Sequence, residues 1–175
     1  GSHTIVQDGD SLGSINWFGA DGVDLASTSA EIRAEIDGTP GENDLPGKLV
    51  FKTTADGASS ATTRLTINSA GVVNVPDNGK FTAGASSDLS IYHDGSHSYI
   101  ADTGTGRLHI NTSELRVNNA ADNEILISAT ENGAVELYYD NEKKFYTQSW
   151  GVTVADATAT TAWLELVSSD GTCGY

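Results

Sequence analysis

Large apolar side chains and basic residues are both scarce in this sequence of 175 residues. Isoleucine, leucine, valine and phenylalanine together make up about a fifth of the chain, and methionine is absent. This fraction lies just above the range that is typical of disordered chains. It excludes a large leucine-rich helical core, and it leaves an all-β chain of short strands or a partly disordered one.

The chain carries nine lysines and arginines against 24 aspartates and glutamates, which gives a net charge of −15. This balance argues against nucleic-acid binding, because binding to the phosphate backbone requires clustered basic side chains. It also argues against binding to an anionic membrane surface. No apolar run approaches the roughly 20 residues that span a bilayer. We therefore predict neither a nucleic-acid partner nor membrane insertion.

The first residues and the single cysteine give little information about function. Gly1, Ser2 and His3 resemble the remnant of a cleaved purification tag, so we interpret the chain as an excised fragment. No signal peptide is recognisable in it. The one cysteine, Cys173, cannot form an intrachain disulfide, and we interpret it as a bystander.

Turn-forming dipeptides recur along the chain and separate short runs of apolar and β-branched residues. Such runs, with turn residues about every 8–12 positions, are typical of all-β proteins. Aspartate-glycine and asparagine-glycine pairs tolerate the positive φ angles of tight turns. These pairs occur at 8–9, 21–22, 37–38, 56–57, 78–79, 94–95, 132–133 and 170–171.

The alternation of apolar and polar residues predicts the strands. The predicted strands lie at 29–37, 49–51, 65–67, 89–92, 108–110, 115–117, 125–127 and 135–138. The first of these is the only stretch that also resembles a helix. Ile32, Ala34 and Ile36 alternate there with three charged residues, so we interpret it as a half-exposed strand.

One hairpin pattern occurs twice in the sequence. Residues 89–99 and the segment 46 positions further on both read apolar-x-apolar-Tyr-x-Asp-(Gly or Asn)-x-x-x-aromatic. We interpret each copy as a β-hairpin in which aromatic residues of the two strands face each other. This predicts that Tyr92 lies opposite Tyr99, and Tyr138 opposite Phe145.

Each predicted hairpin offers too few large apolar side chains to form a core by itself. Ordering the backbone costs about 1–2 kcal/mol per residue, whereas apolar burial returns about 25 cal/mol per Å². A chain that is rich in serine and threonine can bury more apolar surface if several copies pack their apolar faces together in a shared core. We therefore predict an intertwined homo-oligomer that its acidic surface keeps soluble.

Several segments of the sequence resemble repeats of one family. The first is IRAEIDGTPGENDLPGKLVFKTTADG at 32–57, with its continuation RLTINSAGVVNV at 64–75. The others are DLSIYHDGSHSYI at 88–100 and ENGAVELYYD at 131–140. These runs are similar to segments of the tail fibres of marine bacteriophages, and the similarity covers roughly residues 12–154.

The resemblance implies an elongated, intertwined homotrimeric β-rod of short strands and hairpins, similar to a β-prism or a triple β-helix. It implies a place on the virion tail fibre, with assembly in the host cytoplasm and action outside the cell. The implied partners are two further copies of the chain, other tail-fibre or virion proteins, and bacterial surface polysaccharide. Many such fibres end in a self-cleaving chaperone with a Ser-Lys dyad, and no lysine of this sequence lies in that context.

These patterns divide the chain into four parts. After the tag remnant at 1–3, we expect an N-terminal β-repeat module at 4–80 and a hairpin-repeat module at 81–157. Residues 158–175 match no repeat. Their apolar run at 162–167 is either a terminal strand that caps the rod or the first strand of a further domain.

Aromatic side chains are the leading candidates for a binding site, because sugar rings stack on exposed aromatic rings. Adjacent strand residues point to opposite faces, so one ring of each adjacent aromatic pair should point outward. The alternative is that these rings only pack on neighbouring strands. The candidate carbohydrate-binding residues are Tyr92, Tyr99, Tyr139, Tyr146 and Trp150.

Metal-binding patterns are weak. His93 and His97 flank a predicted turn and could approach across it, but zinc needs three or four converging ligands. Acidic residues at 8–10, 21–24 and 42–44 supply closely spaced oxygens for calcium, or they serve only as turn residues. We predict no metal site and no cofactor.

Catalytic patterns are weaker still. Glu31 with Glu35, or Asp140 with Glu142, could form the acid pair of a glycan hydrolase. Such pairs arise by chance in so acidic a chain, and we predict no catalytic residue. The sequence therefore favours a non-enzymatic structural part of a tail fibre that supports attachment to the host cell. The alternatives are a receptor-binding tip that binds surface carbohydrate, and a glycan-degrading spike.

Overall fold

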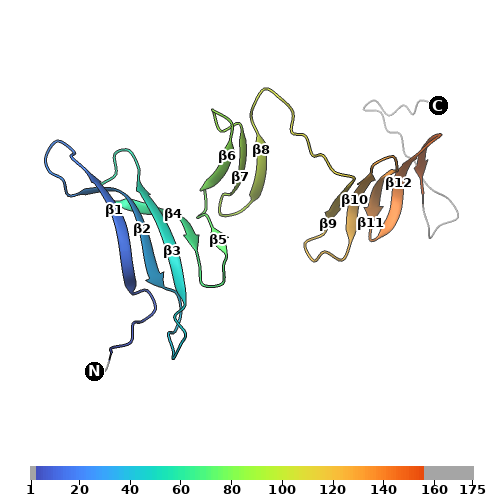
Figure 1. Cartoon of the computed structure of the whole chain (residues 1–175). Helices are drawn as coiled ribbons and strands as arrows, with labels where there is room; N and C mark the ends of the chain where they lie inside the picture. The colour runs from blue at the N-terminus through green and yellow to red at the C-terminus, as the bar shows by residue number, and fades with distance from the viewer. Residues whose placement is uncertain (1–2, 156–175) are drawn as a thin grey trace. The chain divides into compact units, whose positions relative to one another are not determined.

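The computed structural model describes residues 3–155, and these form open antiparallel β-sheets without any helix (Figure 1). The prediction of an all-β chain is therefore confirmed. Contacts divide the chain into two units, 1–108 and 109–175. The predicted strand at 162–167, the turn at 170–171 and Cys173 lie outside the described residues.

The first sheet of the first unit has five strands in sequence order, each antiparallel to the next. They are β1 (Ser11–Gly19), β2 (Ser27–Ile36), β3 (Gly47–Thr54), β4 (Ala61–Ile67) and β5 (Val73–Asn74). The stretch that resembled a helix is the strand β2, as the alternation of its residues predicted. Short connections suffice because consecutive strands pair.

The two faces of this first sheet differ in character. Ile15, Ile32, Phe51 and Leu65 lie side by side on four neighbouring strands and form an apolar row on one face. The charged residues of β2 alternate with this row and lie on the opposite face. Ile15 is 61% exposed, whereas Ile32, Phe51 and Leu65 are half-buried, so the apolar face is only partly covered.

The second sheet of the first unit has three strands, with β7 in the middle. They are β6 (Lys80–Ala83), β7 (Leu89–His93) and β8 (Ser98–Asp102). Phe81, Ile91 and Ile100 pair across the three strands and form a second apolar row, and all three side chains are exposed.

The second unit contains one sheet of five strands in the order β13-β12-β11-β10-β9. Its strands are β9 (Glu114–Asn118), β10 (Ile125–Thr130), β11 (Val135–Tyr139), β12 (Glu142–Gln148) and β13 (Gly151–Val154). A third apolar row runs across all five strands. It consists of Val117, Ile127, Leu137, Phe145 and Val154, of which the first four are exposed.

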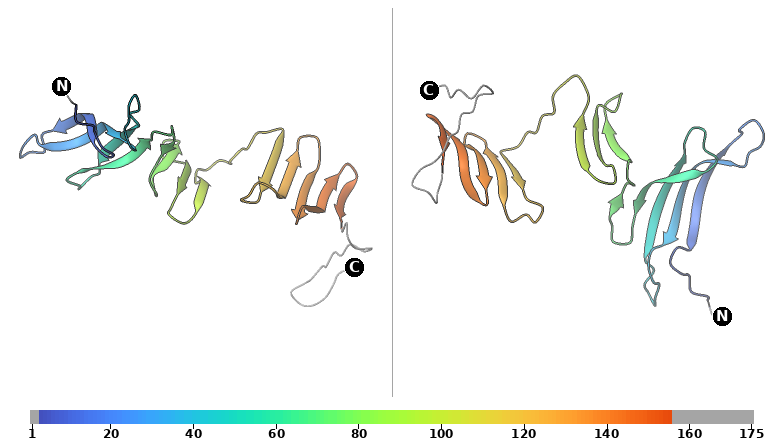
Figure 2. Two further views of the ribbon diagram at one scale, coloured as in Figure 1. Left: turned by 90° about the horizontal axis from the view of Figure 1, so that it is seen from below. Right: turned by 180° about the vertical axis from the view of Figure 1, so that it is seen from behind.

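Figures 1 and 2 show each sheet as a single layer of strands. Among the described residues only two apolar side chains are buried, Ile36 and Val50. Elements with one apolar face normally bury it against a second layer. Residues 3–155 of one chain therefore form β-strands but almost no hydrophobic core.

The repeated hairpin pattern folds in two ways. Tyr92 lies opposite Tyr99 as predicted. In the second copy the prediction is wrong, because Tyr138 lies opposite Lys143 and Phe145 lies opposite Leu137. The first hairpin turns through four residues, whereas the second turns through two residues that both have positive φ, and a bulge then shifts its register.

The predicted strand at 108–110 is also absent from the structure. The described chain between β8 and β9 belongs to no strand there, although its residues alternate as a strand would. The dipeptide turns behave as predicted within the described part of the chain. The glycine has positive φ at 8–9, 21–22, 37–38, 56–57 and 94–95, and the asparagine has it at 78–79 and 132–133.

Replacing Gly95 with alanine tests the turn of the first hairpin. Gly95 has a φ of 97°, a region that side chains with a Cβ rarely adopt. We expect Gly95→Ala to lower the free energy of unfolding by roughly 1–2 kcal/mol, as measured by urea denaturation. Gly19→Ala is the matched control, because Gly19 has ordinary φ and open space around it. An equal effect of both substitutions would contradict the backbone explanation.

Candidate functional site

One face of the β6–β8 sheet carries a row of stacked side chains. Lys80, Tyr92 and Tyr99 are neighbours across the three strands. The Tyr92 and Tyr99 rings stack with centroids 4.7 Å apart and planes at 14°. Lys80 Nζ lies 4.3 Å from the centroid of the Tyr92 ring, within the range of a cation–π interaction. Tyr92 therefore has a neighbour from each adjacent strand, and Tyr99 lies on the edge strand.

The turn beside this row is held by Asp94. Its Oδ1 atom accepts hydrogen bonds from the amides of Ser96 and His97, both at 2.8 Å, and its Oδ2 atom accepts one from the Tyr99 hydroxyl at 2.9 Å. These donors, led by the His97 amide, lower the pKa of Asp94, and the bond to Asp94 raises the pKa of Tyr99. The carboxylate thus fixes both the turn and the tyrosine ring.

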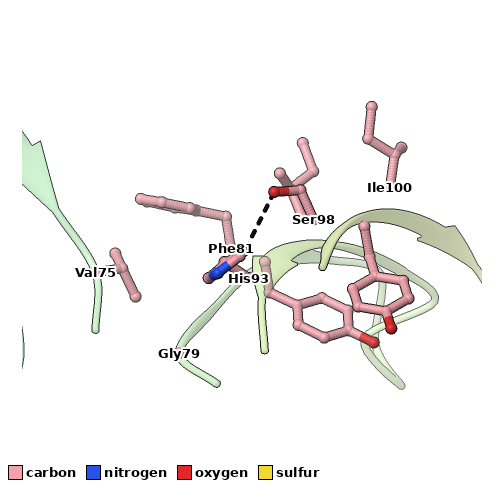
Figure 3. A pocket seen from close by; sticks show the side chains of 9 residues that line it. Val75, Gly79, Phe81, His93, Ser98 and Ile100 are labelled. Carbon is pink, nitrogen blue, oxygen red and sulfur yellow. Dashed lines mark hydrogen bonds between the residues drawn. The ribbon is translucent and has the colours of Figure 1, made fainter. Parts of the chain in front are cut away.

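A groove of about 450 Å³ lies along this sheet. Phe81, Ile91 and Ile100 supply its apolar wall. In Figure 3 the imidazole of His93 and the hydroxyl of Ser98 lie between Phe81 and Ile100, and a hydrogen bond of 3.2 Å joins them. Because its wall includes the exposed apolar row, the groove belongs to the open face of the sheet.

The two weak candidate metal ligands have different partners in the structure. His93 pairs with Ser98 across the hairpin, whereas His97 lies in the turn. The His97 ring lies 6.3 Å from that of Tyr99. Residues 3–155 contain no group of three or more histidine, cysteine or acidic side chains that could hold a metal ion.

The other three candidate aromatic residues lie in the second unit and do not form one cluster. Tyr139 ends β11 and Trp150 lies in the connection from β12 to β13, and the two residues are 75% and 74% exposed. Tyr146 is half-buried, and Lys143 Nζ lies 4.5 Å from its ring centroid. Lys143 also pairs with Glu136 at 2.7 Å.

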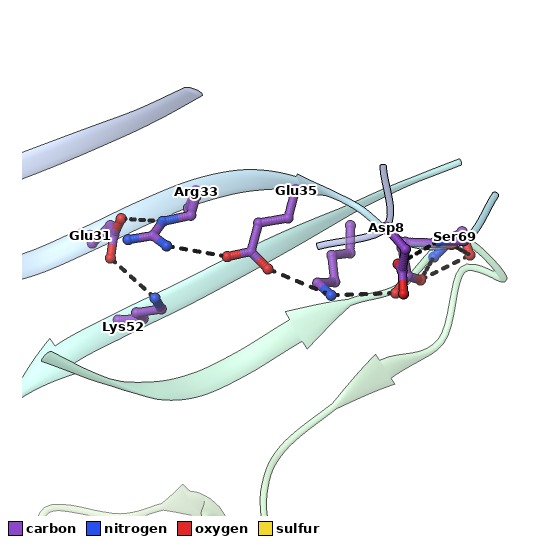
Figure 4. Close-up of polar contacts among 9 residues, drawn as sticks. Asp8, Glu31, Arg33, Glu35, Lys52 and Ser69 are labelled. Atoms are coloured by element: carbon purple, nitrogen blue, oxygen red, sulfur yellow. Dashed lines mark hydrogen bonds and ion pairs between the residues drawn. The ribbon is translucent and has the colours of Figure 1, made fainter. Parts of the chain in front are cut away.

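The polar face of the first sheet carries a continuous row of ion pairs (Figure 4). Glu31 bonds Arg33 Nε at 2.5 Å and Lys52 Nζ at 3.4 Å. Glu35 lies 3.4 Å from Arg33 and 3.5 Å from Lys48. Each carboxylate of this candidate acid pair therefore has two cationic partners.

These ion pairs bear on the hydrolase alternative. Arg33, followed by Lys52, lowers the pKa of Glu31. A general acid for glycoside hydrolysis needs a raised pKa so that it holds a proton near neutral pH. The environment of Glu31 shifts its pKa in the opposite direction, so this pair fits an ion-pair row better than it fits a catalytic dyad.

Two of the acidic residues considered for calcium, Asp21 and Asp8, accept hydrogen bonds from backbone amides. The Asp21 carboxylate accepts hydrogen bonds from the amides of Asp24 and Val23 and from the Ser27 hydroxyl. These bonds lower the pKa of Asp21 to about 2. Asp8 accepts a bond from the Gly38 amide at 2.8 Å. Asp21 thus stabilises its own turn, as in the turn-residue alternative, whereas Asp8 ties the start of the chain to the turn after β2.

Comparisons with known proteins add no relative: no family model matches the chain, and no curated protein matches it. Over residues 3–155 the structure has no helix that is long and apolar enough to cross a lipid bilayer.

Two features of the β6–β8 sheet were not predicted from the sequence. The strand β6 was not predicted (nor was β1 of the first sheet), so the position of Lys80 beside Tyr92 was not foreseen. Asp94 was assigned only to the turn and not to the Tyr99 hydroxyl. The sequence did contain a signal for this bond: Asp94 precedes Tyr99 by five positions, and a hairpin turn between two such residues brings their side chains close together.

Replacing Tyr99 with phenylalanine tests the Asp94 network. The substitution removes one of the three donors to Asp94, so we expect the pKa of Asp94 to rise toward its usual value. The lowered pKa of Asp94 means that its carboxylate stabilises the fold at pH values above the unfolded-state pKa. This stabilisation is lost as the pH falls through the folded-state pKa. Because that pKa is higher in Tyr99→Phe, the variant should lose the stabilisation at a higher pH. A carboxyl-carbon NMR titration measures the shift.

Tyr92→Phe is the matched control, since it keeps the ring stack and leaves the three donors to Asp94 in place. An unchanged Asp94 titration in Tyr99→Phe, or an equal shift in both variants, would contradict the assigned hydrogen bond.

Proposed function

We propose that this protein is a structural segment of a bacteriophage tail fibre and that it acts without catalysis. In this proposal three copies of the chain intertwine and bury their apolar faces against one another, while the polar faces remain in water. The segment supports attachment of the virion to the host cell. Its partners are two further copies and the neighbouring proteins of the fibre.

The observation that carries this proposal is the apolar row that each sheet leaves uncovered. The rows centre on Ile32, Ile91 and Ile127, and each crosses three or more strands on one face. Contiguous exposed apolar surface in a soluble protein marks an interaction site. A row in every sheet favours partners along the whole described chain over one local docking site.

Further copies of the chain are the simplest partners, because most soluble oligomers are assembled from identical subunits. The number three, the intertwined arrangement and the place on the virion come from the resemblance to phage fibres. The opposite faces suit an outer surface, since they carry the ion pairs of Glu31, Glu35 and Glu136. A strongly acidic surface also disfavours side-by-side association of rods.

A second candidate function is binding of bacterial surface carbohydrate. The observation that favours it is the exposure of Trp150, since a tryptophan is highly buried on average. Its ring and that of Tyr139 are open to stacking by a sugar. Carbohydrate binding at Trp150 is compatible with an assembled rod, because Trp150 lies in a connection between strands. Tyr139 alternates with Leu137 on β11 and therefore lies on the side of the apolar row, which the proposed assembly covers.

Replacing Ile15 with aspartate tests the proposed assembly. A charge buried without a partner is strongly unfavourable, so we expect Ile15→Asp to weaken the trimer and to shift mass toward the single chain in sedimentation velocity. Ser14→Asp introduces the same charge on the opposite face of β1, across from Arg33, and should leave the mass unchanged. In an isolated sheet both positions are exposed and neither substitution would matter. Equal masses of the two variants would contradict the proposal.

Replacing Trp150 with alanine tests carbohydrate binding. Aromatic stacking contributes about 0.5–1.5 kcal/mol, so we expect roughly 3- to 10-fold weaker binding to immobilised bacterial surface polysaccharides. The control is Trp150→Phe, which keeps an aromatic ring and should retain most of the affinity. If the original protein binds none of the polysaccharides, or if Trp150→Ala binds equally well, this second function is rejected.

A further inference from the structure

We propose that residues 107–112 form an additional β-strand that pairs with an edge strand of a second copy of the chain. The inference rests on the proposed assembly, and it specifies one place where the copies exchange backbone hydrogen bonds. It concerns the connection between β8 and β9, where the predicted strand at 108–110 is absent from the described chain.

The backbone of this segment is unpaired. The Thr103 amide donates to Asp88, and the next backbone bond along the chain is accepted by Ser113. Between these points no amide from 105 to 112 donates a hydrogen bond to another described residue. Backbone amides and carbonyls of folded proteins are almost all paired with protein or water, so this run is free to accept a partner strand.

The side chains of the segment alternate as those of a half-buried strand do. Leu108 and Ile110 alternate with Arg107, His109 and Asn111. Leu108 is 47% exposed and Ile110 is 63% exposed. A polar linker would not need two large apolar side chains at this spacing, whereas a strand that completes a sheet in the assembly would bury them on one face.

The strands on either side of the segment supply the edges for such pairing. β8 is an edge strand of its sheet, and β9 is an edge strand of the next. An edge strand presents unpaired amides and carbonyls that accept a further strand. Within its own chain the segment uses neither edge, although both lie close to it in sequence. A second copy has the same two free edge strands, and it also has the apolar faces that the proposed assembly covers.

Amide hydrogen exchange followed by mass spectrometry tests this inference on the assembled full chain. We expect the amides of 107–112 to exchange at least ~100-fold more slowly than those of an unstructured peptide, as in cooperatively folded regions. Ile110→Pro removes one donor and should abolish this protection and weaken the oligomer. Thr105→Pro, which lies outside the proposed strand, is the matched control and should do neither.

The outcomes separate this inference from the proposed function. An oligomer in which 107–112 exchanges as fast as an unstructured peptide overturns the inference and leaves the assembly intact. Protection of the segment in a folded, monomeric Ile15→Asp variant shows pairing within one chain and also overturns it. A protein that is monomeric before any substitution overturns the proposed function, and the inference with it. If Ile15→Asp does not fold, the comparison of Ile110→Pro with Thr105→Pro still decides.

Discussion

The lack of a second layer over its sheets is the constraint on which the rest of this structure depends. Each sheet gathers its apolar residues on one face by simple alternation, and in each that face is open. Only Ile36 and Val50 are buried apolar residues within the described part of the chain. Since apolar burial is the main favourable term in folding, such sheets gain most of their stability from whatever covers them.

The polar faces and the turns determine which face of each sheet is charged and where the chain reverses. Ion pairs between neighbouring strands, such as those of Glu31 and Glu136, keep one face of a sheet charged. Carboxylates such as Asp21 and Asp94 fix the chain reversals through backbone amides. Most of these contacts join residues that are close in sequence, so they define local turns and strand faces and add little apolar burial.

Local patterns in the sequence predicted the strands well, because alternation and turn dipeptides act over a few residues. The strand at β2 and the facing pair of Tyr92 and Tyr99 are examples. The pairing of Tyr138 was missed, because the turn after it has only two residues, both of positive φ, whereas the matching turn of the first hairpin has four. The candidate aromatic residues were identified by residue type and strand alternation, and their spread over separate sheets depends on long-range pairing that local patterns do not encode.

The central claim is that further copies of the chain supply the missing layer. Its most direct test is the absolute mass of the original protein in solution, from light scattering coupled to size-exclusion chromatography and repeated after dilution. The account predicts a mass of three times 18.3 kDa that persists on dilution, with early elution for that mass. A folded, compact species of 18.3 kDa would contradict it.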